Sequence, residues 1–369
     1  MNSEQNPMIE ANGMEVVLGG QKVLDIPSLK VYPHEALVVI GPNGSGKTTL
    51  LLSLALLLKP SAGVLCYKGI PVQDSSMLQL RRRLAVAFQE SLLLNSSVLE
   101  NVTLGLRLRG VKGREVNARA MKWLERFGVA HLAKRQARML SGGEAKRVSL
   151  ARAFVLEPEV LFLDEPFSAL DSPTRQGLLE DFESVLRETK VTTVMVTHDR
   201  NEALVLADRV AVLMNGAISQ LGTPEEVFGA PADEAVAGFV EAGNILHGMV
   251  DCQTDGLVSI NVKGQKIQAM SGLTCGSEAT VFINYEDVTV SLPSPETVRS
   301  SARNQLRGRI TRIFPFGYQV KVTVDCGFPL AAVVTRLSSE ELGLDEGREV
   351  VASFKATAVK VIPGAKEKA

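Results

Sequence analysis

The stretch GPNGSGKT, residues 41–48, combines the residue types that hold phosphate groups in proteins. It fits the pattern GxxxxGK[ST] and stands between a short apolar run, 36–40, and an apolar segment, 48–58, that should form a helix. Its glycines let backbone N–H groups wrap around phosphates, and the helix N-terminus adds the positive end of a dipole. We predict that Lys47 reaches the β- and γ-phosphates of a nucleotide and that the Thr48 hydroxyl binds Mg²⁺. The residues expected at the phosphates are Gly41, Pro42, Asn43, Gly44, Ser45, Gly46, Lys47, Thr48 and Thr49.

Two carboxylates and a histidine follow other apolar runs. The run VLFLDE ends in Asp164 and Glu165, and TTVMVT is followed by His198. An acid at a strand end beside the phosphate loop can hold Mg²⁺, and a second acid can orient or deprotonate the attacking water. We expect Asp164 and Glu165 in these roles. His198 is open to two interpretations, a contact with the γ-phosphate or a surface histidine that starts a helix.

A third feature is the SGG turn, Ser141-Gly142-Gly143, which precedes a segment with helical periodicity. Glycine costs a helix roughly 0.5–1 kcal/mol relative to alanine, so two glycines at its start suggest that something lies against bare backbone there. The hydroxyl and N–H groups of such a turn form a second phosphate-binding surface. The alternative is a plain helix cap.

Residues 1–225 have the alternating strands and helices of an α/β domain. The runs 36–42, 160–166 and 192–198 are short and continuously apolar, as expected of buried parallel strands. A hairpin is expected over 209–221, with its turn at Asn215-Gly216. The candidate residues therefore lie at the carboxyl ends of strands in one sheet.

From about residue 245 the pattern changes to alternation with period two, which indicates strands with one wet face. Val258, Ile260 and Val262 form one such series, and the segment 318–324, from Tyr318 to Val324, forms another. A proline- and serine-rich stretch, 292–304, separates them. We predict an all-β region of two small barrel-like halves.

Composition excludes some classes of protein. Lysine plus arginine number 40 against 41 acidic residues, a net charge of −1, whereas nucleic-acid binders usually carry a basic excess. The run Arg81–Arg83 is interpreted as a solvated helix face. The four cysteines lie far apart, so neither a zinc site nor a disulfide framework is expected. The N-terminus lacks an apolar signal core, and no apolar run approaches the ~20 residues that cross a bilayer.

Six segments, in this order along the chain, resemble those of the ATP-binding cassette (ABC) transporter ATPases. They are the phosphate loop 41–48, Gln89 in VAFQES, LSGGE at 140–144, VLFLDE at 160–165, SALD at 168–171, and His198. The resemblance implies an α/β P-loop NTPase fold over 1–240 with a helical subdomain at about 90–155. It implies ATP and Mg²⁺ as cofactors, with Mg²⁺ held by Thr48, Gln89 and Asp164, and catalysis by Glu165, His198, Lys47 and Gln89.

In that family two cassettes pack head to tail, with each ATP between the phosphate loop of one chain and the LSGGE segment of the other. The resemblance therefore implies a homodimer in which Ser141, Gly142 and Gly143 bind nucleotide in trans and Asp171 bridges the two chains. One position departs from the family pattern. Leu18 stands where an aromatic residue usually stacks on adenine, which puts the selectivity for adenine in doubt.

The C-terminal region resembles the β domains of binding-protein-dependent importers. We expect a first TOBE-like barrel half over 241–293 and a second, Mop-type barrel over 300–364, since SARNQLRG and the later FKATAV recur in molybdate- and tungstate-binding Mop barrels. The resemblance makes Ser301, Arg303, Lys355 and Ala356 candidate ligands of an oxyanion, and charge-assisted donors of this kind suit a divalent anion. The alternative is a scaffold or dimerisation module that binds no anion.

The family also implies partners: separate transmembrane permease subunits, an extracytoplasmic binding protein, and no nucleic acid. The chain is expected on the cytoplasmic side of the inner membrane as a peripheral subunit. Leu92, Leu93 and Leu94 are either part of an apolar docking groove for the permease or core residues. We predict the ATPase of an oxyanion importer, for molybdate or tungstate. The alternatives are the same machine importing sulfate, ferric iron, polyamine or sugar, a non-transport cassette ATPase acting on DNA or ribosomes, and a pure oxyanion sensor.

Overall fold

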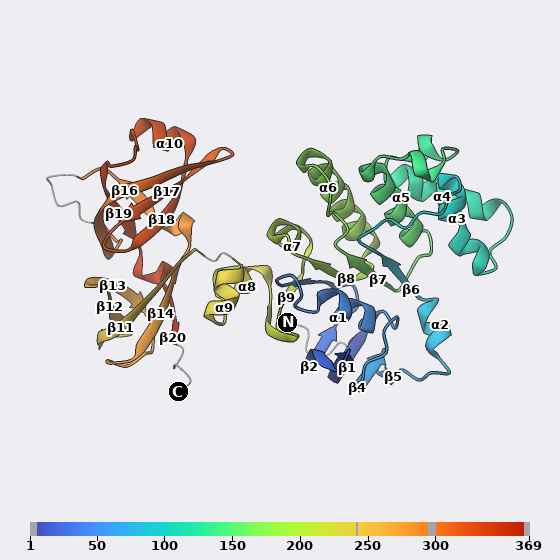
Figure 1. Ribbon diagram of the computed structural model, residues 1–369, viewed down its shortest axis with the longest axis horizontal. Helices are drawn as coiled ribbons and strands as arrows, with labels where there is room; N and C mark the ends of the chain where they lie inside the picture. Colours follow the sequence, from blue (N-terminus) through green and yellow to red (C-terminus); the bar gives the residue numbers. More distant parts are fainter. Residues whose placement is uncertain (1–5, 241–242, 294–299, 365–369) are drawn as a thin grey trace. The chain divides into compact units, whose positions relative to one another are not determined.

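The computed structural model describes residues 6–240, 243–293 and 300–364 (Figure 1). The chain divides into two compact units, Met1–Val227 and Phe228–Ala369. Residues 294–299 of the predicted proline- and serine-rich stretch lie outside the described residues, as do the first five residues of the polar N-terminus. Each unit is described by itself below.

A six-stranded sheet forms the centre of the first unit, with the strand order β10-β9-β3-β8-β7-β6. Strands β9, β3, β8, β7 and β6 are parallel, and β10 pairs with β9 in the antiparallel sense. The three predicted strands are present and are buried along their whole length, which explains their continuous apolar sequences. The strands are β3 (Ala36–Ile40), β6 (Leu84–Ala87), β7 (Val160–Asp164), β8 (Thr192–Thr197), β9 (Arg209–Met214) and β10 (Ala217–Gly222).

The predicted hairpin is confirmed, with Asn215 and Gly216 both at positive φ, 49° and 80°, as a two-residue turn of this type requires. A second, antiparallel sheet has the order β2-β1-β4-β5. Helix α1 packs in the core beside both sheets. These elements are β1 (Ile9–Leu18), β2 (Gln21–Val31), β4 (Ala62–Tyr67), β5 (Ile70–Pro71) and α1 (Lys47–Leu54).

Helix α1 ends four residues before the predicted end of the apolar segment, and its surroundings give the reason. The Tyr67 hydroxyl donates to the carbonyl of Leu54 at 2.9 Å, and Arg81 donates to the carbonyl of Leu56 through both Nε and Nη2. Leu56 itself has φ 61°. Because side chains satisfy these terminal carbonyls, the chain can leave the helix here without buried unpaired groups.

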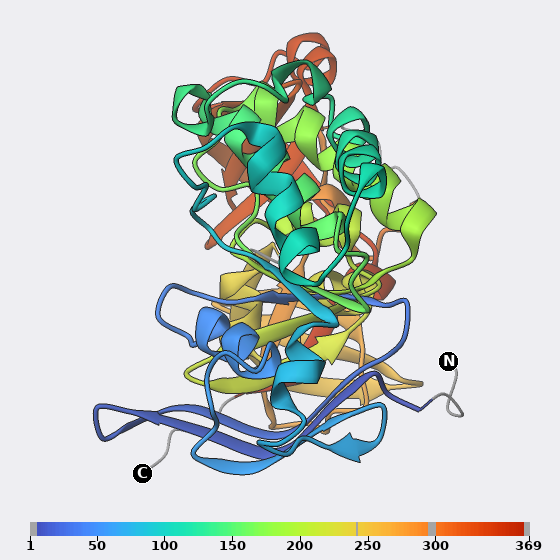
Figure 2. The same cartoon turned by 90° about the vertical axis from the view of Figure 1, so that its right-hand side faces the viewer.

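Helices α3, α4 and α5 gather at the end of the first unit opposite β1, β2 and β4 (Figures 1 and 2). A row of aromatic rings joins this helical region to the rest: Trp123 packs on Phe154, Phe154 on Phe182, and Phe182 on Phe167. The ring centroids lie 4.9–6.0 Å apart, which suits edge or tilted contacts. The helices of this unit are α2 (Met77–Arg81), α3 (Val98–Leu108), α4 (Arg114–Arg126), α5 (Gly142–Phe154), α6 (Ser172–Thr189) and α7 (Arg200–Leu206). Helix α8 (Pro224–Gly229) contains the boundary between the units, and α9 (Glu234–Phe239) belongs to the second.

The second unit contains two five-stranded antiparallel sheets, with the orders β13-β12-β11-β14-β20 and β15-β19-β16-β17-β18. The two halves exchange their last strands, because β20 pairs with β14 of the first half and β15 pairs with β19 of the second. The strands are β11 (Asn244–Thr254), β12 (Leu257–Val262), β13 (Gln265–Met270), β14 (Glu278–Ile283), β15 (Thr289–Ser291), β16 (Asn304–Phe316), β17 (Gln319–Asp325), β18 (Pro329–Thr335), β19 (Glu349–Phe354) and β20 (Lys360–Pro363), with helix α10 (Arg336–Glu341) between β18 and β19.

Each half begins with the same pattern, NxLxG, at 244–248 and at 304–308. The first asparagine in each case is buried and binds backbone of the other half. The Asn244 side chain donates to the carbonyl of Ala331 and accepts from its N–H, at 2.8 and 2.6 Å. The Asn304 side chain exchanges the same two bonds with Gln268, at 2.9 and 2.7 Å. The two asparagines therefore lock the exchanged halves together reciprocally.

Two details differ from the sequence predictions. Tyr318 was placed on a strand face, but it lies in the turn before β17 and is 95% exposed, whereas Val320, Val322 and Val324 are buried as predicted. In the basic run, Arg81 ends α2, and Arg82 and Arg83 follow in a turn. Within the described residues, none of the helices is both long and apolar enough to cross a membrane.

Candidate functional site

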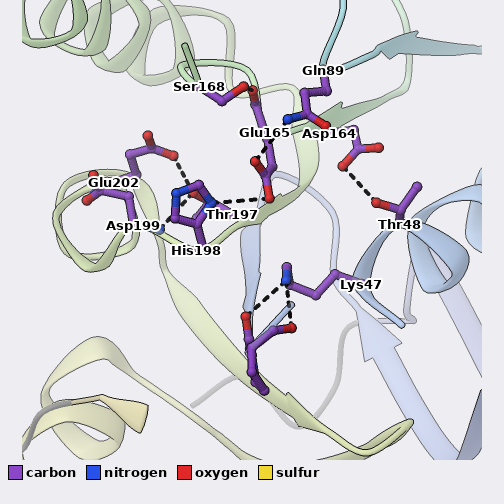
Figure 3. A network of polar contacts seen from close by, with 12 residues as sticks. Lys47, Thr48, Gln89, Asp164, Glu165, Ser168, Thr197, His198, Asp199 and Glu202 are labelled. Atoms are coloured by element: carbon purple, nitrogen blue, oxygen red, sulfur yellow. Dashed lines mark hydrogen bonds and ion pairs between the residues drawn. The ribbon is translucent and has the colours of Figure 1, made fainter. Parts of the chain in front are cut away.

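The phosphate loop lies directly after β3 and before α1. Lys47 Nζ donates to the carbonyls of Gly41 and Pro42, at 2.9 and 3.0 Å, so its side chain lies over the loop (Figure 3). A Cβ atom at Gly41 would lie 2.2 Å from the carbonyl oxygen of Leu213 in β9, which explains why glycine is needed there. The buried Ser45 hydroxyl has no hydrogen-bond partner among the described residues. The loop therefore has a buried polar group that a phosphate could satisfy.

Asp164, the last residue of β7, lies beside this loop. The Thr48 hydroxyl donates to Asp164 Oδ1 at 3.1 Å. Burial raises the pKa of Asp164, and the bond from Thr48 opposes that rise. Burial also lowers the pKa of Lys47. A hydroxyl and a carboxylate are oxygen ligands that suit Mg²⁺. Among the described residues, no group of three or more histidine, cysteine, aspartate or glutamate side chains is placed to hold a metal ion.

Two of the other predicted catalytic side chains, Gln89 and His198, contact Glu165, whereas Lys47 binds its own loop. Gln89 Nε2 donates to Glu165 Oε2 at 3.4 Å, and His198 Nδ1 lies 3.2 Å from Oε1 (Figure 3). The backbone of Glu165 has φ 42°, a conformation that side chains larger than glycine rarely adopt, and its N–H donates to Val196 of β8. Non-glycine residues in such conformations are found preferentially at functional sites.

His198 follows β8 and is held by a network that the sequence did not reveal. The Thr197 hydroxyl donates to Glu202 Oε2 at 2.5 Å and accepts from the N–H of Asp199. Asp199 caps α7 by accepting from Asn201 and Glu202 N–H groups. Glu202 is 3% exposed, and burial raises its pKa to about 7. In the sequence, Glu202 is an acidic residue in the first turn of a helix capped by Asp199. Acidic residues at such positions are usually solvated, so nothing in the sequence indicated a buried one.

The SGG turn begins α5, as predicted. Ser141 is the N-cap and forms a capping box with Glu144. A Cβ atom added at Gly142 would meet no atom within 4 Å, and Gly142 does not have positive φ. The chain itself therefore does not require glycine at this position.

A pocket of about 330 Å³ opens at the SGG turn. It also contains Asp171, which caps α6 through the N–H of Thr174, while no residue of the phosphate loop lines it. The structure thus brings the residues predicted to act in trans together, in a place separate from Lys47. The lining residues are Ser141, Gly142, Gly143, Glu144, Arg147, Ala169, Leu170, Asp171 and Thr174.

Two cations of α5 hold the segment that carries Gln89, which sequence reasoning also missed. Lys146 is buried, its Nζ donates to the carbonyl of Gln89, and burial lowers its pKa. Arg152 donates to the carbonyls of Ser91 and Leu92, at 2.7 and 2.9 Å. Lysine and arginine in a helix after a solvent-facing cap are expected to point to water, so their inward contacts depend on the tertiary fold.

Leu92 and Leu94 are 57% and 51% exposed, so the core interpretation of these leucines is wrong for both of them. Leu93 is intermediate in exposure. Leu18, at the end of β1, is 44% exposed.

The candidate oxyanion residues meet at one end of the β16–β19 pair. Asn304 pairs with Phe354, which places Arg303 and Lys355 side by side just beyond the ladder. Ser301 precedes them, and Ala356 begins a short 3₁₀ turn, 356–358. Ser301, Arg303 and Lys355 are exposed and Ala356 is buried. In the part of the chain that the structure describes, no hydrogen bond or ion pair joins the four.

The chain is similar to known proteins over both of its units. A family model for ABC transporters matches residues 24–168, and one for the TOBE domain matches residues 300–361. The chain is 36% identical to the molybdate/tungstate import ATP-binding protein WtpC of Pyrococcus abyssi, over 92% of this chain and 96% of the relative. It is 33% identical to the spermidine/putrescine import ATP-binding protein PotA of Thermobifida fusca, over 91% and 87% of the two chains.

It is also 36% identical to the sulfate/thiosulfate import ATP-binding protein CysA of Bradyrhizobium diazoefficiens, over 80% and 86% of the two chains. Among solved structures, the ATP-binding cassette MJ0796, a dimer in a post-hydrolysis state with ADP and Pi, matches with a TM-score of 0.54. Its sequence is 28% identical, and the match covers 59% of this chain and 99% of that one. The three curated relatives match most of the chain and differ in the solute that their names give.

Proposed function

This chain belongs to the ATPase subunits of ABC importers, and we propose that it energises the uptake of an oxyanion, with molybdate and tungstate as the first candidates. The predicted α/β cassette fold with a C-terminal β region is confirmed, and so is ATP hydrolysis as the reaction class. The identity of the solute and the roles of single residues are the proposal. The observation that carries the solute is the register of β16 and β19, which brings Arg303 and Lys355 together.

In the proposed reaction Glu165 orients or deprotonates the water that attacks the γ-phosphate, and Lys47 neutralises phosphate charge. Lys47 already lies over its loop, held by the carbonyls of Gly41 and Pro42. His198 and Gln89 both touch Glu165, so each can respond to the presence of a γ-phosphate there. Mg²⁺ bound by Thr48, Asp164 and the Gln89 amide would supply further charge neutralisation at the phosphates.

The second nucleotide contact is proposed to come from another copy of the chain. Gly142 has open space around it, so its lack of a side chain is explained by a group from outside the chain. That group is the nucleotide held by the phosphate loop of the partner, which Ser141 and Gly143 would bind through a hydroxyl and backbone N–H groups. Asp171 lines the same pocket and would bridge the two chains. A homodimer with two shared nucleotide sites follows.

The permease is proposed to be a separate membrane protein that docks on the exposed Leu92 and Leu94. Only Glu90 and Ser91 separate Leu92 from Gln89, and Arg152 binds the carbonyls of Ser91 and Leu92. A movement of the permease against these leucines would therefore be transmitted to Gln89 through the short segment that Arg152 fixes. In this arrangement the chain is a peripheral subunit on the cytoplasmic side, and an extracytoplasmic binding protein delivers the solute to the permease.

Ser301, Arg303, Lys355 and the N–H of Ala356 would bind the oxyanion as a signal of its concentration. Two cations and two neutral donors match a tetrahedral dianion in charge and in hydrogen-bonding capacity. The same donors would bind sulfate, and the sulfate/thiosulfate relative keeps that solute as the second candidate. A polyamine is a cation and would not bind donors of this kind, although the polyamine relative keeps that solute open for the permease.

The test is uptake of molybdate, tungstate, sulfate and spermidine by cells that express the chain with its permease. It is accompanied by calorimetry of the purified full-length chain with each anion. Uptake and calorimetric binding of molybdate or tungstate, with sulfate at least roughly ten-fold weaker, support the proposal. Uptake of sulfate or spermidine instead assigns the transporter to that solute and overturns it.

A further inference from the structure

A closed ring of contacts surrounds Glu165, and only part of it is explained by the roles given above. The Ser168 N–H and hydroxyl both donate to the carbonyl of Glu165, at 3.2 and 2.9 Å. The chain then passes through Ala169, at φ 59°, and reaches Asp171, the N-cap of α6. On the other side His198 Nδ1 contacts the Glu165 carboxylate. The turn 168–171 and His198 therefore approach Glu165 from two directions.

Arg175, in the first turns of α6, connects these two directions. Its Nη2 donates to the carbonyl of Leu170 at 3.1 Å, and its Nη1 donates to Asp199 Oδ2 at 3.3 Å. Its buried Nε has no hydrogen-bond partner among the described residues. The guanidinium thus bridges the turn that precedes α6 and the residue next to His198. The planar guanidinium holds its donors in a fixed fork, which suits two contacts in different directions.

We propose that Arg175 is a positioning residue that holds His198 against Glu165 by tying the turn 168–171 to Asp199. The inference rests on the proposed roles of Glu165 and His198 in hydrolysis. Leu170 also lines the pocket at the SGG turn. A group that fills that pocket would therefore act on His198 through Leu170, Arg175 and Asp199. This route connects the SGG turn, which is proposed to bind the partner's nucleotide, with the hydrolysis site of the same chain.

A purely structural ion pair would give the same static contacts. Asp199 has a structural role of its own, since it caps α7 through its other oxygen, Oδ1. The positioning role differs because it requires His198 to change its surroundings when Arg175 is lost, while the fold stays intact. A readout of His198 itself is therefore needed beside the rate of hydrolysis.

The experiment compares the full-length chain with its Arg175→Met and Arg175→Lys variants. Arg187→Met is the matched control, because Arg187 lies on the same helix and pairs with Glu183 at the surface. The first readout is the imidazole Cε1–Hε1 NMR spectrum. The chain has four histidines, and His198→Gln assigns the resonance of interest by its disappearance. The second readout is kcat and KM for ATP.

We expect Arg175→Met to shift the His198 resonance and to lower kcat roughly ten-fold, with KM changed less than about two-fold. Arg175→Lys, which keeps the charge but not the fork, should recover only part of kcat. Arg175→Met combined with Asp199→Asn should be no slower than the slower single variant, because both break the same link. Arg187→Met should match the parent in both readouts.

An unmoved His198 resonance in a folded Arg175→Met variant overturns the proposal, and so does an equal loss of kcat in Arg187→Met. If Arg175→Met unfolds the chain, the Arg175→Lys variant still decides the question, because a full kcat and an unmoved resonance in that variant refute the need for a bridge. Failure of the proposed function is seen separately. Normal hydrolysis by His198→Gln would remove the catalytic role of His198, while the NMR comparison would still report the contact.

Discussion

The nucleotide site and the candidate oxyanion site differ in how their side chains are held. In the cassette, Thr48 contacts Asp164, and Gln89 and His198 both contact the neighbouring residue, Glu165. Asp164 is buried and Glu165 is half-buried, while the other three are exposed. At the C-terminal site the charged side chains are exposed and only the strand register brings them together. A site of the first kind is organised before its ligand arrives, whereas the second orders its donors when it binds and loses free energy in doing so.

The largest expected effect comes from the organised site. Glu165→Gln keeps the shape of the side chain but removes the base, so the rate of ATP hydrolysis should fall about 10²–10³-fold while nucleotide binding is retained. Steady-state phosphate release and binding of a fluorescent ATP analogue measure the two quantities. Near-normal hydrolysis by this variant would show that the contacts around Glu165 do not organise a catalytic site, and the contrast with the C-terminal site would fail.

The second prediction separates fold from function at the SGG turn. Gly142→Ala has open space for its methyl group and should leave the free energy of unfolding unchanged or raise it by about 0.5 kcal/mol. It should nevertheless lower ATP hydrolysis by roughly 10²-fold, because the methyl group would meet the partner's nucleotide. Gly177→Ala on α6, another glycine with room for a Cβ atom, is the control. Equal activity of the two variants would show that nothing approaches Gly142.

The third prediction concerns the network behind His198. Burial raises the pKa of Glu202 to about 7, above the value of about 4.5 expected in the unfolded chain. The folded state therefore binds the proton more tightly, so stability should fall as the pH rises from about 4.5 to 7 and stay lower above that. Glu202→Gln removes this titration. The variant should therefore keep, at pH 8, on the order of 3 kcal/mol of free energy of unfolding that the parent loses between about pH 4.5 and pH 7. Urea unfolding at pH 5.5 and pH 8 measures it, and an unchanged pH dependence in the variant would count against a buried, titrating Glu202.

The smallest effect is expected at the site held only by register. Lys355→Gln removes one exposed cation and should weaken the binding of molybdate to the full-length chain by roughly ten-fold, as measured by calorimetry. Arg336→Gln, an exposed arginine on α10 that pairs with Glu340, is the matched control. An equal loss of affinity in both variants would mean that molybdate binds through the general positive charge of the chain and not at a site at the end of the β16–β19 pair.

The sequence allowed three central strands of the cassette, β3, β7 and β8, to be predicted because buried parallel strands are short and apolar throughout. It also placed Glu165 and His198 at one edge, since carboxyl ends of parallel strands share an edge. Gln89 was expected there only from the family resemblance. Lys146, Arg175 and Glu202 could not be predicted in this way. Each is a charged residue on a helix, and its inward direction depends on which element packs against that helix.

The C-terminal region shows a different limit. The period-two pattern predicted strands and their buried faces, and Val320, Val322 and Val324 are indeed buried. It could not predict that β15 and β20 cross to the other half, because a short strand carries no sign of its partner. Tyr318 was placed on a strand because an aromatic residue continued the alternation, but Gly317 at φ 60° makes that segment a turn.

The exchanged strands mean that no single cut in the C-terminal unit yields a complete half. The segment that matches the TOBE family, 300–361, contains most of β16–β20 but lacks β15, and the β14 edge on which β20 lies belongs to the other half. Excising it would expose two strand edges. It would also leave the side chains of Asn244 and Asn304 without the backbone groups of the other half to which they bind. The two halves must therefore be kept together in any truncated or transplanted version of the unit. Because each half supplies a strand to the other, a conformational change in one half also changes the other.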